Sequence, residues 1–196
     1  ANGFVEKLQG NHRPPAAHYS LGAEDEGFYA EFLTPLIGSA DKRDGTPDAT
    51  ATIAGVSAQK VRYLDILQPD PWVVTLGPQS DFPVAQPMDL LVASPLRFMV
   101  QKFLIKESRT PDKQAQDLLY VYETLQLFSN CFDLFNREWH ERVAPSMHAG
   151  WARRIQTLWE QSFTSSDDLL VTASRMAPAR TPPISAKQMS IVLKLG

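Results

Sequence analysis

Four cationic side chains and one carboxylate occur close together in the middle of the chain, inside two strongly apolar helical patterns. They are Lys102, Lys106, Arg109, Lys113 and Asp117. The first three follow one another at i, i+4 and i+7, so one helix could carry them on a single stripe. The last two are four residues apart on the helix that is expected next, and a short loop between the helices predicts antiparallel packing. The two charged edges could then converge.

This charged cluster has two interpretations. Several cations gathered around one anion make a phosphate-binding site, because charge-assisted hydrogen bonds to phosphate oxygens are strong. The alternative is a solvated helix face with an intrahelical pair between Lys113 and Asp117, worth only about 0.3–0.5 kcal/mol. The residue types and spacing favour neither interpretation.

A single carboxylate, Glu31, lies within the apolar segment FYAEFLTPL, residues 28–36. A strand over residues 28–34 would place Tyr29, Glu31 and Leu33 on one face, because alternate side chains face opposite ways. An unpaired carboxylate buried there would be costly. Glu31 is therefore either an exposed edge residue or a carboxylate for metal binding or acid–base chemistry, and the local sequence leaves both open.

The elements that must position these residues change in character at Ser94. Before it, short apolar runs predict strands at 18–22, 28–34, 72–76 and 90–93, while residues 59–67 fit a short helix or a strand. After it, Ser94 and Pro95 predict a helix start, and that helix should end near Ser108. Apolar spacing then predicts helices up to Phe128, over 132–143 and over 151–159. An extended linker at 176–183 and a short helix at 185–193 complete the expectations.

Strands followed by helices predict an α+β fold rather than a doubly wound α/β fold. The expected architecture is an N-terminal mixed β-sheet region, residues 1–93, followed by a C-terminal helical bundle, residues 94–196.

Composition excludes several classes of protein. The chain has 196 residues, 43% of them hydrophobic and 21% charged, with a net charge of −3, so overall charge gives no argument for nucleic-acid binding. With Cys131 as its one cysteine, the chain can form neither an intrachain disulfide nor a cysteine zinc site. No apolar run approaches the roughly 20 residues of a membrane span. A cytoplasmic protein without a membrane partner is expected, and the first residue, Ala1, predicts a piece of a longer protein.

Five segments in a fixed order carry a resemblance to a known family. They are RPPAAHYSLG, FYAEFLTPL followed by Gly38, YLDIL, ASPLRFMVQKFLIKESR and DKQAQDLL, within residues 3–128. In this order they resemble bacterial nucleotidyltransferase-like proteins related to the AbiEii-type toxins. The resemblance implies an incomplete nucleotidyltransferase-type sheet, transfer of a nucleotidyl group from a nucleoside triphosphate, Mg²⁺ as cofactor, and an antitoxin-like partner. The acceptor (RNA, protein or small molecule) stays open.

The resemblance also implies roles for individual residues. Glu31 would be a catalytic and metal-binding carboxylate, although the family usually has Asp at this position. Lys102 and Asp117 would be catalytic. Arg109, Lys113 and Lys106 would bind substrate, and Lys102 with Arg109 would offset charge on the leaving pyrophosphate.

One family motif is missing. A D-x-D strand after a Gly-Ser turn supplies two of the family's metal-binding acids, and the sequence contains no D-x-D. The resemblance therefore implies the C-terminal portion of such a protein, inactive as it stands, with Mg²⁺ bound only in the intact protein. The alternatives are a non-catalytic module that binds a nucleotide or a partner, and an interaction protein on a degenerate copy of the fold.

Overall fold

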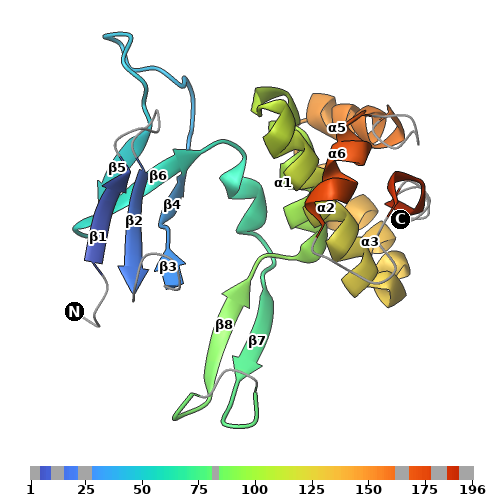
Figure 1. Ribbon diagram of the computed structural model, residues 1–196, viewed down its shortest axis with the longest axis horizontal. Helices are drawn as coiled ribbons and strands as arrows, with labels where there is room; N and C mark the ends of the chain where they lie inside the picture. Colours follow the sequence, from blue (N-terminus) through green and yellow to red (C-terminus); the bar gives the residue numbers. More distant parts are fainter. Residues whose placement is uncertain are drawn as a thin grey trace. The chain divides into compact units, whose positions relative to one another are not determined.

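The computed structural model describes residues 5–9, 16–21, 28–80, 84–161, 168–177 and 185–189 of an α+β protein (Figure 1). The chain divides into two compact units, Ala1–Asp65 and Ile66–Gly196. These bounds differ from the regions 1–93 and 94–196 expected from the sequence. The difference arises because a two-stranded hairpin before Ser94 is grouped with the helices.

Unit 1 holds two small sheets. The first has the antiparallel order β1-β2-β3, made by Val5–Gln9, Ala16–Leu21 and Phe28–Ala30. The second has the order β4-β6-β5, made by Leu33–Pro35, Val56–Val61 and Thr50–Ile53. It is mixed, since β4 is parallel to β6 while β5 is antiparallel to it. Tyr19 connects the sheets: its hydroxyl accepts a hydrogen bond from the Ser57 N–H at 3.1 Å, and its ring packs edge-to-face on Phe32.

The strand expected over residues 28–34 is wrong at its centre. The structure has two strands, β3 and β4, which belong to different sheets, and Glu31 and Phe32 lie between them. Tyr19 supplies a reason for the break, because the contact of Phe32 with its ring falls where the chain leaves one sheet for the other. The undecided segment 59–67 contains both of its alternatives: β6 ends at Val61, and a 3₁₀ helix, η1, covers Leu64–Leu67.

Unit 2 begins with the antiparallel hairpin of β7 (Trp72–Leu76) and β8 (Met88–Val92), close to the strands expected at 72–76 and 90–93. The helices that follow are α1 (Pro95–Ile105), η2 (Lys106–Ser108), α2 (Pro111–Leu127), η3 (Ser129–Cys131), α3 (Phe132–Glu138), a π-helical turn η4 (Trp139–Val143), α4 (Ala144–Ser146), α5 (Ala149–Gln161) and α6 (Asp168–Met176). In the part of unit 2 that the structure describes, no helix has the length and apolar character needed to cross a bilayer.

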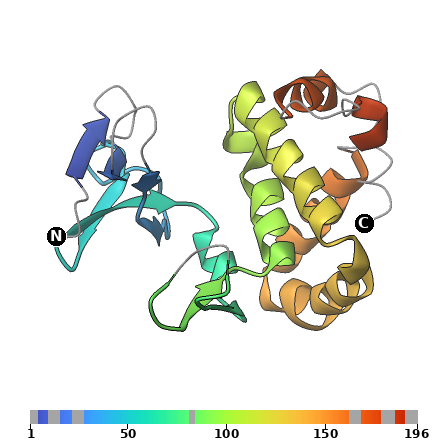
Figure 2. The same cartoon turned by 60° about the horizontal axis from the view of Figure 1, so that its bottom comes forward.

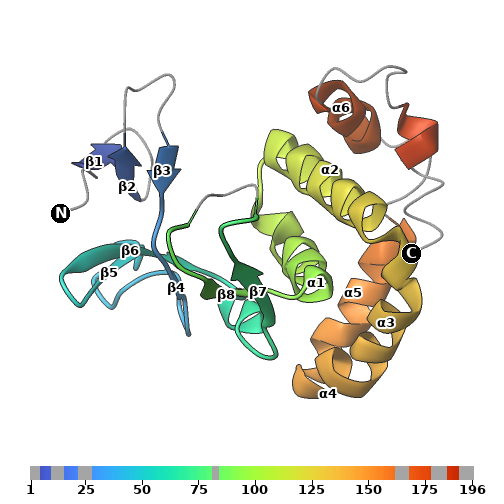
Figure 3. The ribbon, with the colours of Figure 1, turned by 90° about the horizontal axis from the view of Figure 1, so that it is seen from below.

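Helix α1 starts where the sequence predicts. The Ser94 hydroxyl accepts a hydrogen bond from the Arg97 N–H at 3.4 Å, and Pro95 occupies the first turn, where its missing N–H costs nothing. Helices α1 and α2 run side by side (Figure 2), and α2 lies between α1 and α6 (Figure 3). Fully buried side chains of the three helices form the core, among them Met99, Leu104, Val121, Leu125 and Leu170.

Two expected helices differ from the structure. The helix predicted over 132–143 consists of α3 and the π-helical turn, and α4 carries it one residue beyond Pro145. Of the short helix predicted over 185–193, residues 186–189 are helical and Ser185 is not, while residues 190–193 lie outside the described residues, as does most of the linker at 176–183.

Candidate functional site

The charged residues around the turn between α1 and α2 meet at one buried carboxylate. Asp117, in the second turn of α2, has a side chain that is 8% exposed. Its Oδ1 lies 2.9 Å from Nζ of Lys102, and its Oδ2 lies 3.3 Å from Nε of Arg109. The predicted convergence of the charged edges thus occurs for these three residues, but the anion at their centre belongs to the protein. They are called the Asp117 centre below.

Lys102 is held from several sides. Its side chain is 13% exposed, and its ammonium lies 5.1 Å from the ring centroid of Phe98 and 5.4 Å from that of Tyr120. Both distances fall within the range of cation–π attraction. Lys102 is therefore not part of a solvated helix face: its position is fixed by a carboxylate and two rings.

Arg109 reaches Asp117 from outside the helix. The stripe at i, i+4 and i+7 is wrong for this residue, because helical structure ends at Ser108 and Arg109 has extended backbone angles. Its side chain is 37% exposed, the most accessible of the three. Among the described residues, Nε of Arg109 and Oδ2 of Asp117 are buried yet form no well-aligned hydrogen bond, so their contact is mainly electrostatic.

The other two lysines differ in their relation to this centre. Lys106 lines a crevice together with Lys102 and Asp117. The crevice has a volume of about 10 Å³, little more than one water requires, so a phosphate group would have to bind at its outer rim. Lys113 is exposed and donates to Oε1 of Gln116 at 2.9 Å, in place of the pairing with Asp117 that the alternative interpretation of the cluster contained.

The electrostatics of the Asp117 centre favour anions. One carboxylate faces two permanent cations, which leaves a net charge of +1 among these three side chains. Burial raises the strength of these interactions above their value in water. The arrangement can therefore attract an anionic group to its exposed side, where Arg109 lies.

The acidic residues of unit 1 do not gather into a metal site within the described residues. Glu31 is exposed, and no group of three His, Cys, Asp or Glu side chains there could hold a metal ion. Asp48 pairs with Lys60 at 2.7 Å. In Asp44, hydrogen bonds from the Thr46 hydroxyl and backbone N–H lower the pKa of the carboxyl group. Glu31 could supply one ligand, and its catalytic role stays a prediction.

A second charged centre, which the sequence did not suggest, surrounds Arg97 in the first turns of α1. Its side chain is only 2% exposed, and Nη2 lies 2.9 Å from Oδ2 of Asp70. Nε lies 3.9 Å from Oε1 of Glu138, and the same oxygen accepts a hydrogen bond from the Ser94 hydroxyl at 2.6 Å. This Arg97 centre ties the start of α1 to the end of α3 and to the segment before β7. The available signal was an arginine within an apolar helical pattern, at a position that faces the core.

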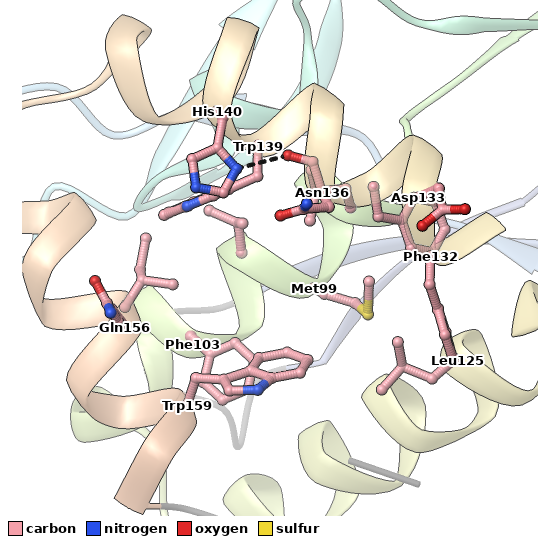
Figure 4. Close-up of a pocket in the computed structure, with 14 residues that line it drawn as sticks. Met99, Phe103, Leu125, Phe132, Asp133, Asn136, Trp139, His140, Gln156 and Trp159 are labelled. Atoms are coloured by element: carbon pink, nitrogen blue, oxygen red, sulfur yellow. Dashed lines mark hydrogen bonds between the residues drawn. The ribbon is translucent and has the colours of Figure 1, made fainter. Parts of the chain in front are cut away.

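A cavity lies between α1, α3, the π-helical turn and α5 (Figure 4). Its volume is about 540 Å³, within the range of small-molecule sites. Apolar and aromatic side chains form most of its wall, and Figure 4 shows Asn136, His140 and Gln156 around it. The sequence-based site did not include these residues, because each looks like an ordinary polar position on the exposed side of a helix.

Comparison with known proteins gives one match. The model of a family described as "Nucleotidyltransferase" matches residues 5–144, which include both sheets of unit 1 and the turn between α1 and α2. No curated protein and no solved structure is significantly similar to the chain.

Proposed function

The chain belongs to this nucleotidyltransferase family, and from that premise we propose that the Asp117 centre binds the phosphates of a nucleoside triphosphate. Family membership supports a nucleotidyl-transfer type of function in general. The acceptor is a prediction and could be an RNA, a protein or a small molecule. A relation to the AbiEii-type toxins, and with it an antitoxin-like partner, is likewise a prediction.

The observation that carries the proposal is the charge balance of the centre. Two cations converge on one buried carboxylate and leave positive charge in excess at the exposed side of Arg109. Lys102 alone already neutralises the buried Asp117 carboxylate, and a buried charge without a counter-ion is costly. The second cation is thus the feature that a triphosphate would use.

The three residues have different roles in this proposal. Arg109 donates hydrogen bonds to phosphate oxygens, because its guanidinium is the accessible cation and suits bidentate contact with them. Lys102, which is mostly buried and lies near two aromatic rings, contributes positive charge to the site without being the group that contacts the phosphates. Asp117 touches both cations and orients them, so it acts as a positioning residue.

Magnesium is the cofactor that this family implies. When bound, Mg²⁺ would neutralise the triphosphate and polarise the phosphorus that is attacked. The described residues do not fit a complete Mg²⁺ site, because no three acidic or imidazole groups lie together among them. Glu31 is our candidate for a single ligand. We expect no nucleotidyl transfer by this chain, since no D-x-D supplies the metal-binding acids.

The test measures binding of ATP, GTP, CTP and UTP to the chain by calorimetry, without metal. We expect dissociation constants from sub-millimolar to millimolar, because a few charge-assisted hydrogen bonds are offset by the cost of association. Arg109→Ala should weaken binding roughly fivefold to tenfold. The exposed Arg142→Ala is the matched control and should leave it unchanged. Equal losses in both variants would mean that diffuse electrostatics, and not the Asp117 centre, attracts the triphosphate.

A transfer assay separates the enzyme from its alternative. Incubation with α-labelled triphosphates, Mg²⁺ and pooled RNA or protein acceptors should give no labelled product. Metal-dependent labelling would contradict the prediction that the chain is inactive without a D-x-D motif. Glu31 and its neighbours would then be the candidates for the metal-binding acids. Binding without transfer also fits the non-catalytic nucleotide-binding module, and transfer by a longer chain that contains a D-x-D strand would decide for the enzyme.

A further inference from the structure

We propose that the cavity between α1, α3 and α5 is a binding site for a nucleobase. This inference rests on the proposed function for the type of ligand, but its site is separate from the Asp117 centre. The cavity and the crevice beside Lys102 share one wall residue, Phe103, so the base and the phosphates would be bound in the same unit.

The lining of the cavity suits a flat aromatic ring. Its floor consists of buried apolar side chains, including Met99, Val100 and Leu125. Trp159 packs on Phe103 with ring centroids 5.3 Å apart, and Trp139 lines the cavity from the π-helical turn (Figure 4). Stacking on aromatic side chains is the common way in which proteins hold unpaired bases, and it is worth a substantial part of the binding energy.

The lining of the cavity offers no counter-charge to a phosphate. Asp133 is the one lining residue with a permanent charge, and that charge is negative; no Lys or Arg occurs among the residues that line the cavity. An anionic ligand would therefore be repelled. An uncharged heteroaromatic ring would not be, so the cavity and the Asp117 centre select opposite ends of a nucleotide.

The polar groups at the rim fit the edge of a base. Asn136 offers an amide, whose donor and acceptor lie side by side as they do on the edge of a base. Nδ1 of His140 lies 2.8 Å from the backbone oxygen of Asn136, which can only accept, so this contact selects the tautomer with the proton on Nδ1, in which Nε2 is an acceptor. Gln156 lines the opposite side (Figure 4).

The backbone conformation at the edge of the cavity supports a binding site independently of the side chains that line it. Trp139 and His140 both belong to the π-helical turn Trp139–Val143. Such turns are rare and frequent at functional sites. Here the turn carries one aromatic wall and one polar group of the same cavity.

The test uses nucleosides, because without phosphates they cannot bind through the cations of the Asp117 centre. Adenosine, guanosine, cytidine and uridine are titrated into ¹⁵N-labelled chain, and the indole N–H resonances are followed by NMR. At least one nucleoside should shift the signals of Trp139 and Trp159 saturably, while those of Trp72 and Trp151, which do not line the cavity, stay in place. No saturable shift with any nucleoside up to its solubility limit would overturn the proposal.

Rim variants test the polar contacts. Asn136→Ala and Gln156→Ala should each weaken binding of that nucleoside roughly fivefold, the effect of one lost hydrogen bond. The matched controls are Asn130→Ala and Gln126→Ala, exposed residues of the same types that do not line the cavity. All four positions are at the surface, so the variants should fold. Equal weakening in variants and controls would contradict a site at this cavity.

Two further ligands identify where the base comes from. Weakening of the matching triphosphate by Asn136→Ala would identify the base of the donor. Weakening of a short single-stranded oligonucleotide instead would identify a base of an RNA acceptor. Arg109→Ala should leave nucleoside binding unchanged, so a failure of the proposed phosphate site and a failure of this base site give different results.

Discussion

Helix α1 carries a charged centre at each end, and the two centres have opposite composition. At its start, one buried cation, Arg97, lies between two carboxylates, Asp70 and Glu138. At its end, one buried carboxylate, Asp117, lies between two cations, Lys102 and Arg109. Both follow the same physical rule, that a charge enters the interior only with counter-charges around it.

The two centres differ in the surroundings of the charge that they have in excess. The Arg97 centre has surplus negative charge, and half-exposed Asp70 can place its share in water. Within that centre the side chains hold three segments of backbone together, so its function is structural. The Asp117 centre has surplus positive charge at a turn, where an anionic ligand can reach it. The comparison teaches that the buried charge of each centre is the one that stabilises the fold. The exposed charge in excess, here that of Arg109, marks the side that a ligand can reach.

The largest expected effect comes from removing the buried cation. Arg97→Met keeps much of the volume but leaves Glu138 without its counter-ion, so the free energy of unfolding should fall by about 3–5 kcal/mol. Urea unfolding followed by circular dichroism measures it. Arg142→Met, at an exposed position, should change the value by less than about 0.5 kcal/mol. An equally small loss in Arg97→Met would show that the fold does not depend on the buried cation, and the structural role of the Arg97 centre would then be wrong.

Removing the buried carboxylate should have the next largest effect. Asp117→Asn leaves Lys102 buried without a full negative charge, but its two aromatic rings remain, so the loss should be about 1.5–3 kcal/mol. The double variant Asp117→Asn/Lys102→Met should recover part of it, because no unpaired charge is left in the interior. Exposed Glu141→Gln is the control. A double variant less stable than Asp117→Asn would contradict this, because Lys102 would then stabilise the fold even without the charge of Asp117.

The exposed cation should separate stability from binding. Arg109 is more than one-third exposed, so solvent screens its contact with Asp117 and Arg109→Ala should cost less than about 1 kcal/mol of unfolding free energy. The same variant should bind triphosphate several-fold more weakly, as described above. Urea unfolding and calorimetry on one preparation give both numbers. A large loss of stability would make Arg109 a structural residue, like Arg97.

The smallest effect concerns Asp44, an exposed carboxylate outside both centres. The Thr46 hydroxyl and backbone N–H lower its pKa, so its stabilising contribution is present above its usual pKa and is lost as pH falls through the lowered value. Thr46→Val should raise the pKa partway back, with little change in unfolding free energy. The ¹³C carboxyl shift of Asp44 against pH measures it. An unchanged pKa would show that the hydroxyl hydrogen bond does not matter in solution.

The sequence predicted the parts of the fold that local chemistry decides. Ser94 and Pro95 start α1 as expected, and the strand at 72–76 has its predicted bounds. It did not predict the break at Glu31, because the change of sheet there depends on β3 pairing with β2 and β4 pairing with β6, and the local sequence does not specify these partners. The short strands β1 and β5 and the helix α6 were also missed. α6 buries Leu170 and Ala173.

The candidate site was predicted in composition but not in geometry. Spacing placed Lys102 and Asp117 near each other, since a short loop forces the chain back on itself. Spacing could not show that the helix ends before Arg109, or that Lys113 pairs with Gln116 instead. The Arg97 centre required knowing that Glu138 returns to the start of α1, which only the packing of α3 determines.

The π-helical turn makes the proposed base site sensitive to the number of residues in this segment. A π-helical turn is equivalent to one residue inserted into an α-helix. Deleting one of residues 141–143, the part of the turn that does not line the cavity, would restore the α-helical register and rotate the side chains before the turn, relative to those after it, by about 100°. Asn136 would then turn away from the wall formed by α5. A change in length by one residue could therefore abolish or create this cavity without altering any residue that lines it.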